Sequence, residues 1–319
     1  MSSRPGLTVR ALYGVNRFLK MVLLFVVPLV EELIARLAPY TAKSIDLANT
    51  NLRLNQMQMV QHYRVIREGR AQPLSFRDVE FRAYSQNGED GILLYILSLL
   101  GIENGGRCIE ICCGTGMECN TANLIVNHGW SGFLVDGDTV HVKRARAFFR
   151  RRAPRLGPPK VVACFVTAEN VNSILADNGF ERDIELLSLD MDGNDYWVLK
   201  SLAIEPKVIV LEYNNVLGPD LSITMPYVAD FPIQKEVSSQ GAVEYTGASL
   251  RAFTKLCKLK GYRLVGCESS GFNAFFVRQG LAEDHLPEID VTECFRSPNT
   301  IWAMQHRWPL TKDLEWVEV

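Results

Sequence analysis

The chain has 319 residues, which suits one core domain of ordinary size with additions at its termini. Hydrophobic residues make up 47% and charged residues 22%, and this composition excludes disorder, collagen-like repeats and a polytopic membrane protein. The net charge of −2 excludes an overall basic field, so we expect no nucleic-acid partner. The eight cysteines show no zinc-type spacing and are expected to stay reduced, with the cytoplasm as the default location.

Residues 1–80 are expected to form an N-terminal helical arm. Its first 70 residues carry ten Lys/Arg and four Asp/Glu, whereas the whole chain carries more acids than bases. Met21–Val30 is a run of ten apolar residues, shorter than the roughly 20 that a membrane-spanning helix needs. A longer helix over residues 12–37 would lie at a membrane surface, dock on a second subunit of a homo-oligomer, or pack on the protein's own core, and the sequence leaves these alternatives open.

Residues 81–280 are expected to form the core, because short apolar strands alternate there with helices. The predicted strands cover residues 107–112, 132–136, 161–165, 184–190 and 208–213. The predicted helices begin at a Ser85 cap and continue at residues 118–128, 168–177, 195–202 and 249–260. This alternation predicts an α/β fold with a doubly wound, mostly parallel sheet that is covered on both faces.

The end of the chain departs from this alternation. Two late strands, residues 262–267 and 272–278, are joined by a short turn and predict an antiparallel hairpin that makes one edge of the sheet mixed. Residues 281–319 form a tail with three tryptophans, Trp302, Trp308 and Trp316, and this tail is too apolar to remain exposed to solvent. We expect this tail to pack on the core or on a second subunit.

The first strand and its turn indicate the ligand class, since ligands of doubly wound sheets bind at the carboxyl ends of the strands. Gly114 and Gly116 let the backbone approach a ligand, but Cys119 stands where a dinucleotide fingerprint has its third glycine. Asp136, which ends the second strand, can accept hydrogen bonds from ribose hydroxyls. Glu110 suits an ammonium group better than a pyrophosphate, so the pattern favours S-adenosylmethionine over NAD.

Acidic residues also gather at the ends of the fourth and fifth strands. Asp190, Asp192, Glu212 and Asn214 offer oxygen ligands of the kind that Mg²⁺ prefers, and a metal there would lower the pKa of a substrate hydroxyl. Without a metal, Asp190 or Asp192 would act directly as the general base. The third alternative is structural, with Asp192 and Asp195 capping the helix that follows.

Five blocks of sequence, in this order, resemble FkbM-type class I methyltransferases over about residues 80–280. They are YSQNGEDGIL (84–93), IEICCGTGMECNTANL (109–124), GFLVDGD (132–138), LLSLDMDGNDYWVLKSL (186–202) and VIVLEYN (208–214). The resemblance implies a seven-stranded Rossmann-like methyltransferase sheet. It also implies methyl transfer from S-adenosylmethionine to oxygen, often on a sugar, glycolipid or polyketide.

The resemblance also assigns site residues. Glu110, Gly114 and Gly116 would line the cofactor, Asp136 would hold its ribose, and Asp190 would border it. Gln86 and Glu89 would reach in from the preceding helix. Cys112 stands where the family's turn has its first glycine, and its Cβ would narrow the space beside the methionine end of the cofactor.

Residues 217–231 lack periodicity and are expected to form a lid over the acceptor, with Tyr227, Phe231 and Tyr245 stacking on a sugar. The sequence therefore predicts an O-methyltransferase that acts on a sugar, glycan or glycolipid, with contact to a membrane surface through the arm as one alternative. A second reading is a non-catalytic methyltransferase-fold protein that acts in assembly or membrane recruitment. A nicotinamide dehydrogenase is a more distant third.

Overall fold

The computed structural model describes residues 39–40, 43–44, 46–153, 157–229, 235–238 and 241–319. The chain divides after Met59 into two units, and the larger one, Val60–Val319, contains all the elements named below. The apolar run Met21–Val30 lies outside the described residues, so its predicted membrane or subunit contact stays a prediction. Within the part of the chain that is described, no helix combines the length and apolar character that crossing a membrane requires.

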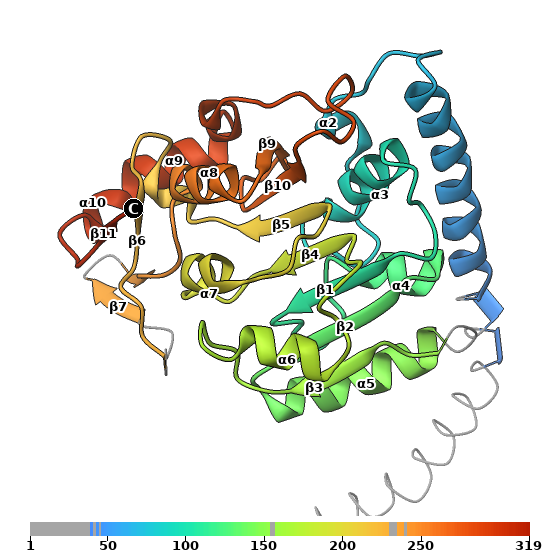
Figure 1. The fold of residues 1–319 in the computed structure, drawn as a ribbon, viewed down its shortest axis with the longest axis horizontal. Helices are drawn as coiled ribbons and strands as arrows, with labels where there is room; N and C mark the ends of the chain where they lie inside the picture. The colour runs from blue at the N-terminus through green and yellow to red at the C-terminus, as the bar shows by residue number, and fades with distance from the viewer. Residues whose placement is uncertain (1–38, 41–42, 45, 154–156, 230–234, 239–240) are drawn as a thin grey trace, which may run out of the picture. The chain divides into compact units, whose positions relative to one another are not determined.

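The core of the larger unit is one seven-stranded sheet, as the sequence predicts (Figure 1). The strand order is β3-β2-β1-β4-β5-β10-β9, in which the first five strands are parallel and β10 runs antiparallel to both neighbours. The bounds are β1 (Arg107–Ile111), β2 (Ser131–Asp136), β3 (Lys160–Ala163), β4 (Leu186–Leu189), β5 (Val208–Glu212), β9 (Tyr262–Cys267) and β10 (Asn273–Arg278). The chain therefore has the Rossmann-like methyltransferase fold with its hairpin at one edge.

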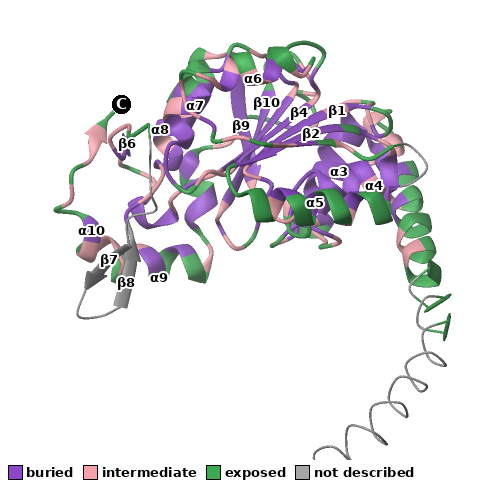
Figure 2. Cartoon of the chain, turned by 90° about the horizontal axis from the view of Figure 1, so that it is seen from below, coloured by how far each residue is buried: buried purple, intermediate pink, exposed green. Residues whose placement is uncertain are grey.

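Helices cover both faces of this sheet (Figure 2). One layer consists of α3 (Glu89–Leu99), α4 (Ala122–His128) and α5 (Thr139–Arg152), and the other of α6 (Val171–Asp177), α7 (Asp195–Ser201) and α8 (Leu250–Leu259). Because both faces are covered, the central strands are mostly apolar, and β4 is buried at every position. Phe133, Phe275 and Phe276 are among the largest side chains in this core.

The start of α3 differs from the sequence prediction. The helix begins at Glu89 after a Gly88 N-cap with a φ of 126°. Ser85 is not the N-cap residue, but its hydroxyl accepts the backbone N–H of Asp90 in the first turn at 3.1 Å. The Glu89 carboxylate instead accepts hydrogen bonds from the backbone N–H groups of Asn87 and Gly88 at 2.8 and 2.9 Å. Gly91 lets α3 approach the preceding chain, because a Cβ there would lie 2.0 Å from the carbonyl oxygen of Val79. Ser85 and Glu89 therefore share the backbone N–H groups at the start of α3.

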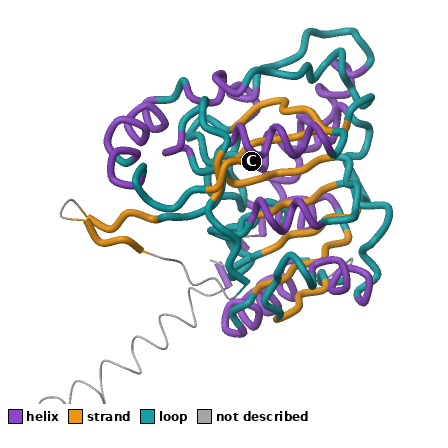
Figure 3. The backbone as a smooth tube through the Cα atoms, turned by 60° about the vertical axis from the view of Figure 1, so that its left-hand side comes forward, coloured by secondary structure: helices purple, strands orange, loops and turns teal. Residues whose placement is uncertain are grey.

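The segment that follows β5 is more structured than the loop that the sequence predicts. It contains η1 (Asn215–Leu217) and β6 (Ile223–Thr224), and β6 pairs with β11 (Val317–Glu318) at the end of the tail. The remaining elements are α2 (Phe76–Val79), β7 (Lys235–Ser238), β8 (Gly241–Glu244), η2 (Val291–Phe295), α9 (Pro298–His306) and α10 (Trp308–Thr311). β7 and β8 form a separate two-stranded hairpin beside the main sheet (Figure 3). The tail thus returns to the strand-end side of the sheet.

Candidate functional site

The register of the sheet places four side chains in one row at its carboxyl edge. Ile111 of β1 pairs with Val135 of β2 and with Leu189 of β4, and Leu189 pairs in turn with Leu211 of β5. The next residues, Cys112, Asp136, Asp190 and Glu212, therefore follow these strands at the same level. The row crosses the point between β1 and β4 where the strand order reverses, which is where doubly wound folds bind ligands.

A cavity of about 690 Å³ opens above this row, within the size range of small-molecule sites. Its lining comes from the ends of β1, β2, β3 and β4 and from the chain before α3. The residues are Gln86, Cys112, Gly114, Thr115, Glu118, Asp136, Gly137, Asp138, His141, Phe165, Val166, Asp190, Met191, Asp192 and Asn194. Five of the predicted site residues thus share one cavity: Gln86, Gly114, Asp136, Asp190 and Asp192.

Glu110 does not line this cavity, although the sequence predicts that it does. Its side chain is buried and accepts hydrogen bonds from the backbone N–H groups of Asn120 and Thr121, at 3.1 and 2.9 Å, and from the Ser188 hydroxyl at 3.2 Å. Burial raises the pKa of Glu110, and the hydrogen bonds from Thr121 and Asn120 oppose that rise. The carboxylate therefore fastens the start of α4 to the middle of the sheet.

Glu89 and Gly116 also lie outside the cavity lining. Glu89 is fully buried, and besides the N–H groups at the start of α3 it accepts a hydrogen bond from the side-chain amide of Asn273 on β10 at 2.8 Å. Gly116 faces the helix layer, where an added Cβ would lie 2.8 Å from the ring of Phe149. The glycine is required for packing under the turn, so its role differs from that of Gly114.

Asp136 is the best-positioned carboxylate for the predicted ribose. Its Oδ2 accepts the backbone N–H of Gly114 and its Oδ1 that of Asp138, both at 2.8 Å, and these bonds hold the carboxylate at the cavity wall. His141 of α5 lies 3.5 Å from Oδ1 and lines the same wall. Asp138 caps α5 by accepting the backbone N–H of Val140 at 2.6 Å.

Two lining residues adopt a backbone conformation that favours glycine. Cys112 has a φ of 65° and Asp192 a φ of 57°. Non-glycine residues in this region are uncommon and often belong to functional sites. Cys112 occupies the position of the missing glycine in the conformation that a glycine would adopt, and its side chain lines the cavity.

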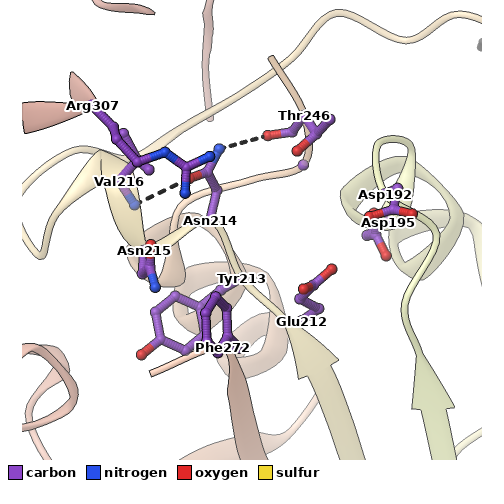
Figure 4. A pocket seen from close by; sticks show the side chains of 11 residues that line it. Asp192, Asp195, Glu212, Tyr213, Asn214, Asn215, Val216, Thr246, Phe272 and Arg307 are labelled. Carbon is purple, nitrogen blue, oxygen red and sulfur yellow. Dashed lines mark hydrogen bonds between the residues drawn. The ribbon is translucent and has the colours of Figure 1, made fainter. Parts of the chain in front are cut away.

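A second, smaller pocket of about 80 Å³ adjoins the row on the β5 side (Figure 4). Asp192 lines both this pocket and the large cavity, whereas Glu212 lines only the small one.

Asn214 is a predicted metal ligand, but both polar atoms of its side-chain amide are engaged. Nδ2 donates to the carbonyl oxygen of Thr246 at 2.9 Å, and Oδ1 accepts the N–H of Val216 at 3.1 Å. It therefore holds the loop after β5.

The acids at the ends of β4 and β5 shift one another's pKa values. Burial raises the pKa of Asp190 to about 6, and the charge of Asp192 adds to the rise. Burial and repulsion by Asp190 raise the pKa of Glu212 well above its ordinary value. The two carboxyl groups lie close enough to share one proton, which relieves their repulsion.

The same acids meet the geometric demands of a cation site. One oxygen each of Asp190, Asp192 and Glu212 lies within 4.8 Å of the others, which suits a divalent ion with oxygen ligands. Asp195 does not belong to this group, because it accepts the backbone N–H groups of Met191 and Gly193 at 2.7 and 2.9 Å. Asp195 thus braces the turn before α7, as the structural alternative predicts for it.

The two predicted stacking residues that the structure describes, Tyr227 and Tyr245, do not line the cavity. Tyr245 is 8% exposed and packs edge-on against Trp316, with ring centroids 4.8 Å apart. The hydroxyl of Tyr227 donates to Glu169 at 2.5 Å and accepts the N–H of Ala168 at 3.2 Å. Phe231 lies outside the described residues. The cavity has a different aromatic residue, Phe165, which is 49% exposed and follows β3.

Sequence reasoning also missed Asp138, His141 and Phe165 as lining residues. All three lie within five residues after the end of β2 or β3, so extending the search past each strand end would have found them. Arg307, which lines the small pocket, gave no such signal, because it comes from the tail.

In sequence, the chain matches neither a protein-family model nor a curated protein. Its fold is similar to that of 310 chains of known structure. One is magnesium protoporphyrin IX methyltransferase from Synechocystis PCC 6803 with bound SAM, at 10% identity over 60% of this chain and 78% of that one, with a TM-score of 0.40. Another is a SAM-dependent methyltransferase from Thiobacillus denitrificans in complex with S-adenosyl-L-homocysteine, at 17% identity over 58% and 68%, with a TM-score of 0.34.

The cyclase SpnF is a third, at 11% identity over 66% of this chain and 74% of that one, with a TM-score of 0.35. At such identities the likeness concerns the fold alone, and one fold serves different reactions. The neighbours thus include SAM-dependent methyltransferases, and the function has to be argued from the residues of the site.

Proposed function

We propose that the protein is an S-adenosylmethionine-dependent methyltransferase that transfers a methyl group to a hydroxyl of a sugar, glycan or glycolipid. One observation carries the cofactor assignment. Apart from the thiol of Cys112, the ionisable residues that line the large cavity, among those the structure describes, are acids and one histidine: Glu118, Asp136, Asp138, Asp190, Asp192 and His141. S-adenosylmethionine carries a sulfonium and an ammonium against one carboxylate, whereas the pyrophosphate of NAD is anionic. An acidic wall therefore favours S-adenosylmethionine over NAD.

The cavity has a place for each part of this cofactor. The fixed carboxylate of Asp136 accepts hydrogen bonds from the ribose hydroxyls, and the exposed ring of Phe165 offers an apolar face to the adenine. At Gly114 no atom lies within 4 Å of the position of an added Cβ, so the turn leaves room for the methionine end. Asp190 borders that end and attracts its ammonium group.

The acids at the ends of β4 and β5 supply the chemistry. The bound cofactor provides an electrophilic methyl group, and the protein has to align the acceptor hydroxyl and remove its proton. Asp192 lies in the wall that both cavities share, so it can accept that proton from a hydroxyl held in the small pocket. The raised pKa of Asp190, about 6, makes it a stronger base than an ordinary aspartate.

A divalent cation is a further candidate for the same place. Asp190, Asp192 and Glu212 would hold it, and it would lower the pKa of the acceptor hydroxyl. The sugar or glycolipid character of the acceptor depends on the resemblance of the five sequence blocks.

Titration calorimetry with S-adenosylhomocysteine and with NAD tests the cofactor assignment. We expect the wild type to bind the former and not the latter. Asp136→Asn should weaken that binding about ten-fold or more, because a hydrogen bond to a charged group is lost. Asp284→Asn, an exposed acid elsewhere, makes the same change of net charge and should leave affinity unchanged. Binding of NAD alone would refute the proposal and support a dehydrogenase.

Two observations favour the alternative of a non-catalytic methyltransferase-fold protein that acts in assembly or membrane recruitment. Cys112 lines the cavity at the position where a glycine is expected. Glu110 accepts hydrogen bonds from the backbone at the start of α4 and does not line the cavity. If neither S-adenosylmethionine nor its demethylated product gives heat of binding, this alternative replaces the enzyme.

A further inference from the structure

An arginine from the tail reaches the acidic small pocket. Arg307 lies between α9 and α10, and its side chain lines the pocket together with Asp192, Asp195 and Glu212 (Figure 4). In Figure 4 it enters beside Asn214, from the side opposite the two aspartates. The pairing of β11 with β6 holds the end of the tail to the segment after β5. A positive group from a remote part of the chain therefore borders the strand-end acids.

The Arg307 side chain has no hydrogen-bond or ion-pair partner among the described residues. Other arginines near the tail do have partners: Arg251 donates to the carbonyl oxygen of Pro219 at 2.6 Å, and Arg296 pairs with Glu293. A half-buried guanidinium without a partner retains five donors in a rigid planar fork. Arg307 is thus available to a ligand.

The neutral polar groups beside Arg307 are already engaged. Asn214 bonds to Thr246 and Val216, and the side-chain amide of Asn215 donates to the carbonyl oxygen of Gly271 at 2.8 Å. The pocket volume of about 80 Å³ is roughly half that of a cavity of about 150 Å³ that holds one benzene molecule. This space suits one small charged group and not a whole sugar ring.

The acids across the pocket do not exclude an anion. Both oxygens of Asp195 accept backbone N–H groups, that of Met191 at 2.7 Å and that of Gly193 at 2.9 Å, so this carboxylate is engaged by its own turn. In Figure 4, Asp192 and Asp195 lie on the side of the pocket opposite Arg307, which leaves space for a ligand group beside the arginine.

We propose that Arg307 binds an anionic oxygen group, a carboxylate or a phosphate, on the acceptor, and so selects acidic or phosphorylated sugars. This inference rests on the proposed function, in which the small pocket is the acceptor side of the site. An arginine fork matches both anions with two parallel hydrogen bonds. Because Asp192 borders both cavities, an acceptor anchored at Arg307 presents a neighbouring hydroxyl to the base.

The test uses the full-length protein with S-adenosylhomocysteine and three probes: D-glucuronate, D-glucose 6-phosphate and D-glucose. We expect one charged sugar to bind about ten-fold more tightly than glucose, measured by ligand-observed NMR titration, because the hydrogen bonds to it are charge-assisted. The preferred probe identifies the anion as carboxylate or phosphate.

Two variants and one control locate the effect. Arg307→Gln should abolish the preference, and Arg307→Lys should keep part of it, since a lysine retains the charge without the fork. Arg151→Gln, an exposed arginine of α5, removes one positive charge elsewhere and should keep the preference. Melting temperatures verify that the variants are folded.

Equal binding of all three sugars by the wild type overturns the inference, and so does a preference that survives in Arg307→Gln. Binding of S-adenosylhomocysteine by Arg307→Gln should match that of the wild type, which separates this site from the cofactor cavity. The sugar titrations are repeated without S-adenosylhomocysteine. Failure of the cofactor to bind to the wild type counts against the proposed function, whereas the absence of an anion preference in the wild type counts against the role of Arg307 alone.

Discussion

Asp90 at the start of α3 and Asp190 at the end of β4 have pKa values raised to the same level, about 6, but they belong to different kinds of site. Burial is the largest cause in both. At Asp90, one oxygen accepts the backbone N–H groups of Ala83, Tyr84 and Ser85 at 2.6–2.8 Å and the Ser85 hydroxyl at 3.0 Å. At Asp190, the neighbours are other acids, Asp192 and Glu212.

The difference between these two residues separates a structural cause of a raised carboxyl pKa from a functional one. Asp90 is surrounded by donors from its own chain and lies in none of the cavities described above, so its raised pKa is a by-product of fastening residues 83–85 to α3. Asp190 has like charges beside it and a cavity in front of it. Repulsion between acids that face a cavity is a stronger sign of function than burial alone.

The largest expected effect is on stability, at Asp90. Asp90→Ala leaves three backbone N–H groups and a hydroxyl without their acceptor, and we expect the free energy of unfolding to fall by about 3 kcal/mol. Asp90→Asn keeps an acceptor oxygen and removes the buried charge, so it should stay within about 1 kcal/mol of the wild type. Urea unfolding measures both. If the two variants lose equal stability, the charge and not the hydrogen bonds of Asp90 is what matters.

The same comparison explains what the sequence could predict. Apolar strands that end in acids are visible as local patterns, so the order of β1 to β5 and the row of Cys112, Asp136, Asp190 and Glu212 could be inferred. The pattern does not show which way a side chain turns. The sequence predicts Glu110 as a ligand residue, but its carboxylate bonds to the N–H groups of Asn120 and Thr121, ten and eleven positions further along the chain.

Tertiary contacts account for the other differences. The start of α3 depends on the backbone of residues 79–81 lying against Gly91, which a serine cap signal does not reveal. Tyr245 was expected to stack on a sugar, but Trp316 from the end of the chain covers it. Such pairs join residues that are remote in sequence, and nothing in either local segment indicates the other.

A smaller effect, of opposite sign, is expected at Glu212. The folded-state pKa values of Asp190 and Glu212 lie above their unfolded values, so the stability that this pair contributes is present at low pH and is lost as the pH rises. The wild type should therefore lose stability between pH 5 and pH 8 through this pair. Glu212→Gln removes the repulsion and should raise the free energy of unfolding at pH 8 by about 1–2 kcal/mol, with little change at pH 5.

Urea unfolding of the two proteins at both pH values measures this difference. Other acids with raised pKa values, such as Asp90 and Asp195, remain in both proteins, so the comparison isolates the pair. Glu181→Gln, at an exposed position, is the matched control and should leave the pH dependence unaltered. A variant that is less stable than the wild type at pH 8 would show that the pair is not repulsive there.

The same proteins test for a metal. If the three acids bind Mg²⁺, the ion should raise the melting temperature of the wild type more at pH 8 than at pH 5, because protons compete for the carboxylates. Glu212→Gln should lose most of that increase. Identical melting curves in Mg²⁺ and in chelator would exclude a metal at Asp190, Asp192 and Glu212.

The smallest effect concerns Cys112, in the turn after β1. Cys112 has a φ of 65°, where glycine is favoured, so Cys112→Gly relieves backbone strain but removes a packed side chain. The two changes oppose each other, and stability should change by less than about 1 kcal/mol. Removal of the Cβ widens the cavity, and affinity for S-adenosylhomocysteine should rise a few-fold in calorimetry. Cys112→Ala keeps the Cβ and is the control: if it binds as tightly as Cys112→Gly, the thiol and not the Cβ restricts the cavity.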